Sequence, residues 1–153
     1  MEIMGLVVIV LLITVAIFFV IRFVVFADQD DHLSDFTRTQ TAANLISAMR
    51  KTTTECNGLS YEELIQACAT NPYRSCGART VCSELEGISE FLLAKTLREW
   101  GDQDYYFRIF NAGSDYVEKS SNDRCSRQSV GALKQEFVPS SAGIVTIELK
   151  ICG

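Results

Sequence analysis

Several residue types and motifs that mark catalytic or metal sites are scarce in this 153-residue chain. It has one histidine, one tryptophan and two prolines, and no C-x-x-C pair, no Asn-x-Ser/Thr triplet and no Gly-rich phosphate loop. His32 has no second imidazole to form a metal pair, and the cysteine spacings of 12, 8, 6, 43 and 27 residues do not fit a zinc site. The acidic cluster of Asp28, Asp30, Asp31 and Asp35 lacks the EF-hand spacing. We therefore predict no enzyme activity, no metal and no other cofactor.

Basic residues are absent from the start of the chain. No lysine or arginine precedes Arg22, and from Ile3 to Ile21 only Gly5 and Thr14 interrupt an apolar run. A run of at least about 18 apolar residues is typical of a membrane-spanning helix. We therefore predict that residues 1–27 form a hydrophobic transmembrane or filament-core helix.

Helix-breaking residues are also absent from the next segment. No proline or glycine occurs from Leu6 to Asn57, and apolar residues recur at helical spacing between Leu33 and Met49. We expect residues 28–55 to continue the first helix as an amphipathic segment. Two helices with a break at Asp28–Asp31 are the alternative.

The charge at the start of the chain does not fit a secretory signal peptide, which opens with a basic segment. Here Glu2 precedes the apolar run, and no basic residue lies on its cytoplasmic flank. One economical interpretation is that Met1 is not the start of translation. A short basic leader would then have been removed immediately before the apolar segment.

The opening MEIMGLVVIVLLITVAIFF resembles those of archaeal pilin-like members of the type IV pilin superfamily. The resemblance implies that a leader peptidase cuts on the cytoplasmic side and that the hydrophobic segment becomes the mature N-terminus. It also implies insertion in the membrane before assembly, dependence on the pilus assembly machinery, and a homopolymer held together by the N-terminal helix. The assembly-helix residues that we single out are Glu2, Gly5, Val10, Thr14, Phe18 and Arg22.

In a filament core, Glu2 would need a nearby amine, because an unpaired buried carboxylate costs several kcal/mol. The freed N-terminus of its own or an adjacent subunit is the expected donor. Arg22 could reach Glu2 only from a staggered neighbour, since the two lie roughly 30 Å apart along one helix.

All the cysteines follow the hydrophobic segment. An even number in an exported domain predicts disulfides, with free thiols or a metal as alternatives. The first four crowd into a turn-rich region, which suggests two bridges among them, and the last two would then tie down the C-terminus. The candidates are Cys56, Cys68, Cys76, Cys82, Cys125 and Cys152.

The residues from 56 to 153 predict an extracytoplasmic head in which helices precede strands. Ser60 and Glu63 fit a capping box at the start of a short helix, and a longer helix is expected from about 82 to 100. Alternating patterns predict strands at 105–110, 135–138 and 144–152. We expect Trp100 and the aromatic residues 105–107 to lie in the core. The fold class is therefore α+β, a hydrophobic helical stalk followed by a small disulfide-stapled head with an antiparallel sheet.

Two functions are consistent with these features of the sequence. The first is a structural subunit of an extracellular type IV pilus-like filament at the cell surface, with an adhesive or appendage role. The alternative is a single-pass membrane-anchored extracytoplasmic binding domain that does not polymerise. The net charge of −5 argues against nucleic acid as a partner.

Overall fold

The hydrophobic N-terminal segment is helical in the computed structural model of this protein. The structure describes residues 2–27, 29–127 and 129–152, with side chains described at 5, 7–21, 35–127 and 129–152. Helix α1 spans Glu2–Ala27 and helix α2 spans Gln29–Lys51. The chain divides into two compact units, Met1–Phe36 and Thr37–Gly153.

The prediction of a long, membrane-spanning N-terminal helix is wrong for the described part of the chain. None of the helices in that part is long and apolar enough to cross a membrane. Helix α1 ends at Ala27 and α2 begins at Gln29, and the expected continuity of the helix at Asp28 lies outside the described residues.

Helix α2 ends at Lys51, where the β-branched residues Thr52, Thr53 and Thr54 follow. Thr54 donates its backbone N–H to the carbonyl of Leu59, and Thr53 forms a bridge with Ser60, which closes a tight turn. Asn57 and Gly58 take positive φ angles of 53° and 74° in this turn, a conformation that glycine adopts at no steric cost. The turn directs the chain from α2 into the next helix.

The head unit (Thr37–Gly153) contains two further α-helices. Helix α3 spans Tyr61–Thr70 and begins with the predicted capping box of Ser60 and Glu63. Helix α4 spans Val81–Leu93 and continues as a π-helix, η1, over Ala94–Glu99. Between them, β1 (Ser75–Cys76) and β2 (Arg79–Thr80) form a small antiparallel hairpin.

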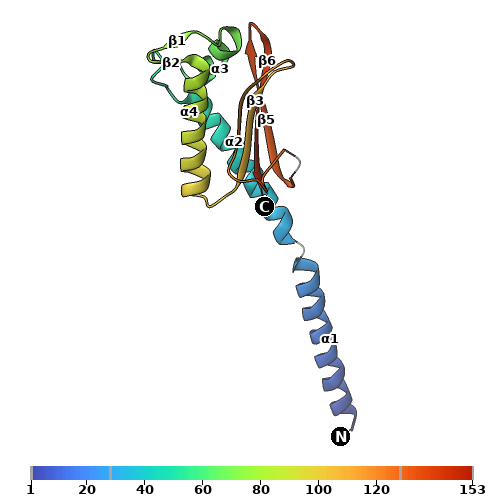
Figure 1. Ribbon diagram of the computed structural model, residues 1–153. Helices are drawn as coiled ribbons and strands as arrows, with labels where there is room; N and C mark the ends of the chain where they lie inside the picture. The colour runs from blue at the N-terminus through green and yellow to red at the C-terminus, as the bar shows by residue number, and fades with distance from the viewer. Residues whose placement is uncertain (1, 28, 128, 153) are drawn as a thin grey trace. The chain divides into compact units, whose positions relative to one another are not determined.

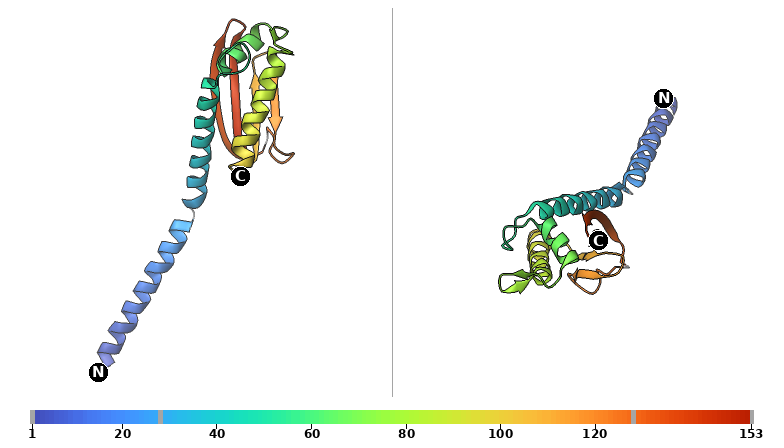
Figure 2. Two further views of the ribbon diagram at one scale, coloured as in Figure 1. Left: turned by 90° about the vertical axis from the view of Figure 1, so that its left-hand side faces the viewer. Right: turned by 90° about the horizontal axis from the view of Figure 1, so that it is seen from above.

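A four-stranded antiparallel sheet completes the head and confirms its α+β class (Figure 1). The strands are β3 (Tyr105–Phe110), β4 (Asp115–Ser120), β5 (Gly131–Ser140) and β6 (Gly143–Cys152), in the spatial order β4-β3-β6-β5. Three were predicted, whereas β4 was not. The C-terminal half of α2, α3 and α4 pack on one face of this sheet (Figure 2).

Alternate residues of β3 and β6 point toward the helices and form the core between the helices and the sheet. Tyr105 and Phe107 of β3 are buried in this core, as expected, and Ile109 is buried with them. Tyr106 is also buried, but outside this core cluster. Strand β6 contributes four buried apolar residues. Those four are Val145, Ile147, Leu149 and Ile151. The expectation that Trp100 lies in this core is wrong, because it is 73% exposed. The helical ladder ends at Glu99, so Trp100 falls beyond the buried stripe that ends at Leu97.

Three disulfides staple the head, which confirms the predicted use of all six cysteines. The bridges are Cys56–Cys76, Cys68–Cys82 and Cys125–Cys152. The first two are interlocked in sequence, since each closes a loop that contains one cysteine of the other. Three disulfides in so small a domain are typical of a protein exported to an oxidising environment.

We expect peptide mapping of the unreduced protein to recover the interlocked pairing in the α3–α4 region. Protease fragments should link Cys56 to Cys76 and Cys68 to Cys82, because the fold brings their Cα atoms to 5.1 Å and 4.9 Å. Mass spectrometry before and after reduction identifies the linked fragments. Recovery of Cys56 linked to Cys68 would contradict the fold of this region.

Candidate functional site

The described surface of α1 is apolar on every side. Each large apolar side chain from Val7 to Ile21 is between 44% and 67% exposed, although such residues are normally buried. Successive helical residues are rotated by about 100°, so an uninterrupted run of this kind leaves no polar face. A helix that is hydrophobic all round is stable only when an apolar environment surrounds it.

The structure describes four of the six predicted assembly residues in full and only the backbone of the other two. Val10, Thr14 and Phe18 follow each other at intervals of four, so they lie along one side of α1. Gly5 leaves open space where another residue would carry a Cβ atom. The side chains of Glu2 and Arg22 lie outside the described residues, as does the proposed amine partner of Glu2.

Thr14 is polar but needs no partner outside its own helix. Its hydroxyl lies 3.1 Å from the carbonyl oxygen of Val10 and 2.9 Å from that of Leu11, and it can donate to either. Surrounding this helix with apolar groups therefore leaves no unsatisfied side-chain donor between Val7 and Ile21. The α1 surface is suited to burial on all sides.

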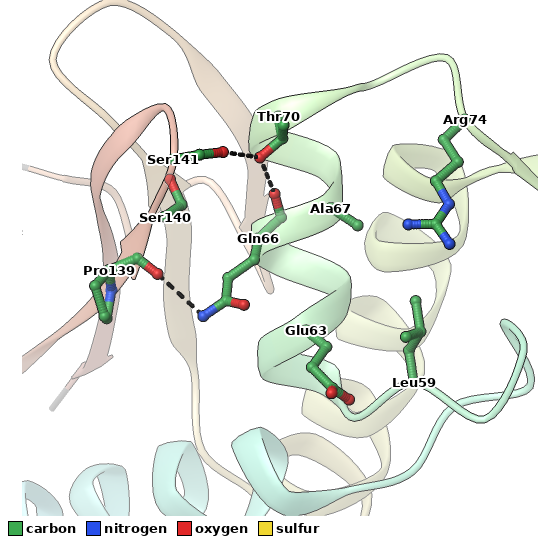
Figure 3. A pocket seen from close by; sticks show the side chains of 9 residues that line it. All are labelled: Leu59, Glu63, Gln66, Ala67, Thr70, Arg74, Pro139, Ser140 and Ser141. Atoms are coloured by element: carbon green, nitrogen blue, oxygen red, sulfur yellow. Dashed lines mark hydrogen bonds between the residues drawn. The ribbon is translucent and has the colours of Figure 1, made fainter.

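The head carries a shallow cleft of about 590 Å³ between α3 and the β5–β6 turn (Figure 3). Gln66 donates its amide N–H to the carbonyl of Pro139 at 3.0 Å. The hydroxyls of Thr70 and Ser141 lie 2.8 Å apart, and Thr70 also donates to the carbonyl of Gln66 at 2.8 Å. These contacts hold the β5–β6 turn against α3, so the polar groups on this side of the cleft serve the fold.

The other polar groups of the cleft have similar roles. The Ser140 hydroxyl donates to the carbonyl of Gly143 at 2.7 Å, and the Glu63 carboxylate accepts from the backbone N–H and the hydroxyl of Ser60 at 2.7 Å and 2.8 Å. Arg74 is exposed on the opposite side of α3 from Ser140 (Figure 3). The cleft thus contains the hydroxyls of Thr70, Ser140 and Ser141 and the carboxylate of Glu63, and each of these groups has a hydrogen-bond partner within the fold.

The capping box should give a measurable pH signature. The backbone N–H of Ser60, followed by its hydroxyl, holds the pKa of the Glu63 carboxyl below its ordinary value. Because the folded pKa is lowered, this contribution to stability is present above the unfolded pKa and is lost as the pH falls through the folded pKa. In an NMR titration, Ser60→Ala should move the pKa of Glu63 toward its ordinary value. Ser140→Ala, a matched change on the other side of the cleft, should leave it in place.

Two features of the head surface were not predicted. The outer-sheet patch consists of Leu133, Phe137 and Ile144, which point away from the helices. The second is a shallow, open hollow of about 460 Å³ on one face of α4 and η1, lined by Gly87, Glu90, Phe91, Ala94, Lys95 and Glu99. The sequence signal for the patch was the position of Leu133 and Phe137, which alternate with Ala132 and Val138 and must therefore face the opposite way.

Comparison with known proteins gives no relative: no family model, no curated protein and no solved structure matches this chain.

Proposed function

We propose that this protein is a structural subunit of an extracellular, type IV pilus-like filament, whose copies associate through the exposed apolar surface of α1. The observation that supports the proposal most is the exposure of every large apolar side chain from Val7 to Ile21. Burying one such side chain stabilises an association by roughly 1.5–3 kcal/mol. A surface of this size is therefore a strong driving force for assembly.

The shape of the apolar surface favours many neighbours over one. A helix in a two-stranded coiled coil buries a narrow stripe and keeps the remainder of its surface polar. Residues 7–21 have no polar stripe, so a single partner helix would leave most of them in water. Several copies of α1 packed around each other would cover all sides, and the internal hydrogen bonds of Thr14 remove the cost of burying its hydroxyl.

The head supports the same proposal through its covalent bonds. Three disulfides join α3, the β1–β2 hairpin, α4 and the C-terminal strand within one small unit. Each closed loop stabilises a domain by about 2–4 kcal/mol. A subunit displayed outside the cell benefits from this resistance to unfolding. A leader peptidase and an assembly machinery are the partners that such a subunit needs.

Assembly of the oxidised full chain tests the proposal. The protein is purified in mild detergent, the detergent is removed by dialysis, and the product is examined by sedimentation and negative-stain electron microscopy. We expect pelletable filaments of uniform width. A product made only of monomers or small closed oligomers would favour the non-polymerising binding domain instead.

A further inference from the structure

The disulfide between Cys125 and Cys152 differs from the other two in its surroundings. Both bridges of the α3–α4 region belong to the apolar core or pack against it. Neither Cys125 nor Cys152 is part of that core, and their bridge joins the loop between β4 and β5 to the last residue of strand β6. Breaking this bridge therefore does not require the core to open.

This bridge is accessible from solvent at one of its two cysteines. Cys152 is partly exposed, although Cys125 is only 1% exposed. Cys82 is partly exposed as well, but its partner Cys68 is completely buried in the core. A thiolate that attacked Cys82 would release the thiolate of Cys68 into apolar surroundings, which disfavour the charged form. Reduction of the Cys68–Cys82 bridge is therefore opposed by the core around it.

Polar groups surround the bridge between Cys125 and Cys152 instead. The Ser129 hydroxyl lies 3.3 Å from Sγ of Cys152. Lys150 precedes Cys152 by two residues and therefore shares its face of β6, and its ammonium group donates to the carbonyl of Ser129 at 3.0 Å. A hydrogen-bond donor and a positive charge both stabilise a thiolate. The surroundings of this bridge therefore favour its reduction on the folded head.

The same bridge fastens a loop over the outer face of the sheet. Tyr106 lies on that face, since its neighbours on β3 point to the core, yet it is only 3% exposed. Ser126 and Arg127 of the loop line a hollow together with Tyr106. Lys150, 6% exposed on the same face, donates to the carbonyls of these two loop residues at 3.4 Å and 2.5 Å. The loop is thus held by one covalent bond and by the hydrogen bonds of Lys150.

We propose that Cys125–Cys152 is a redox-sensitive latch, which an external dithiol opens while the rest of the head stays folded. One thiolate of the dithiol attacks Sγ of Cys152, and the electron pair of the broken S–S bond passes to Sγ of Cys125, which then takes a proton. The second thiol of the dithiol resolves the mixed disulfide, so Cys152 leaves as a thiol and the dithiol becomes a disulfide. Two electrons and two protons thus pass from the dithiol to the bridge.

Opening the latch frees residues 121–127 from the outer face of the sheet and uncovers Tyr106. The remaining two bridges and the core between the helices and the sheet stay intact, because neither includes Cys125 or Cys152. The latch belongs to the head and opens whether or not α1 assembles.

Reduction of the oxidised full-length protein by dithiothreitol, a dithiol, tests the latch. Samples in mild detergent and native buffer are quenched at intervals with iodoacetamide, and mass spectrometry measures the labelling of each cysteine. We expect Cys125 and Cys152 to be labelled at least about tenfold faster than the four cysteines of the α3–α4 region, because opening at this site is local. Equal rates for the three bridges would overturn the latch, as would earlier labelling of Cys68 and Cys82.

Hydrogen exchange tests whether the open latch releases the loop. In the double variant Cys125→Ser/Cys152→Ser we expect at least about tenfold faster exchange in residues 121–127 than in the parent protein, with unchanged exchange in β3. The matched control, Cys68→Ser/Cys82→Ser, should instead raise exchange in α3 and α4, because that bridge lies in the core. Unchanged exchange in residues 121–127 would overturn release of the loop. Faster exchange in β3 would show that the bridge supports the core and is not a latch.

Discussion

Val10→Asp is expected to abolish assembly of the full chain while the head stays folded. Val10 lies near the middle of the exposed apolar stretch of α1 and is 51% exposed. In a bundle of such helices the aspartate of each copy would be buried among apolar neighbours, where an unpaired carboxylate costs several kcal/mol. Every subunit would carry this cost, so we expect no pelletable filaments after detergent removal.

Val130→Asp is the matched control for this variant. It introduces the same charge at a strongly exposed position of the head, so sedimentation and electron microscopy should show filaments as in the parent protein. Near-ultraviolet circular dichroism of both variants should retain the parent signal, because neither position contributes to the head core. Filaments from Val10→Asp at the parent yield would exclude α1 as the assembly surface.

Phe107→Ala is expected to destabilise the oxidised head by about 3–5 kcal/mol. Phe107 is fully buried on β3, paired with Leu149 of β6 and Lys119 of β4, at the centre of the sheet face that packs on the helices. The substitution removes a large side chain and leaves a cavity in a close-packed core. The loss is a large share of the roughly 5–15 kcal/mol that stabilises a typical domain.

Urea denaturation followed by circular dichroism measures this effect as a lower midpoint at an unchanged slope. Phe137→Ala is the matched control, because it removes the same atoms from the outer-sheet patch. In the monomeric protein its effect should stay within about 0.5 kcal/mol, as for other exposed positions. Equal destabilisation by the two substitutions would show that the core does not lie between the helices and the sheet.

Local signals in the sequence predicted those elements whose stability depends on near neighbours. Ser60 and Glu63 lie three residues apart, so their reciprocal hydrogen bonds could be inferred without knowledge of the fold. The alternation of buried and outward-facing residues along β3 and β6 is likewise a pattern between near neighbours in the sequence. Strand β4 was missed because only Val117 of its six residues is buried, and its pairing with β3 depends on contacts made across the sheet.

The surroundings of the apolar helix could not be inferred from the sequence. The large apolar side chains from Val7 to Ile21 are exposed on α1. Hydropathy along a chain does not distinguish lipid from a sheath of identical helices, because both are apolar surroundings. What covers the apolar surface of α1 therefore depends on whether copies of the protein assemble.

Composition and periodicity are enough to establish an apolar N-terminal helix and a cysteine-rich α+β head, because both signals act over a few residues at a time. The pairing of the cysteines needed the fold, since Cys56 meets Cys76 and Cys68 meets Cys82 only after the α2–α3 turn and the β1–β2 hairpin have formed. The fold was also needed to establish that the side chain of Phe137 points to solvent and that of Phe107 points toward the helices. A strand alternates between two faces, and packing against the helices fixes which of them is buried.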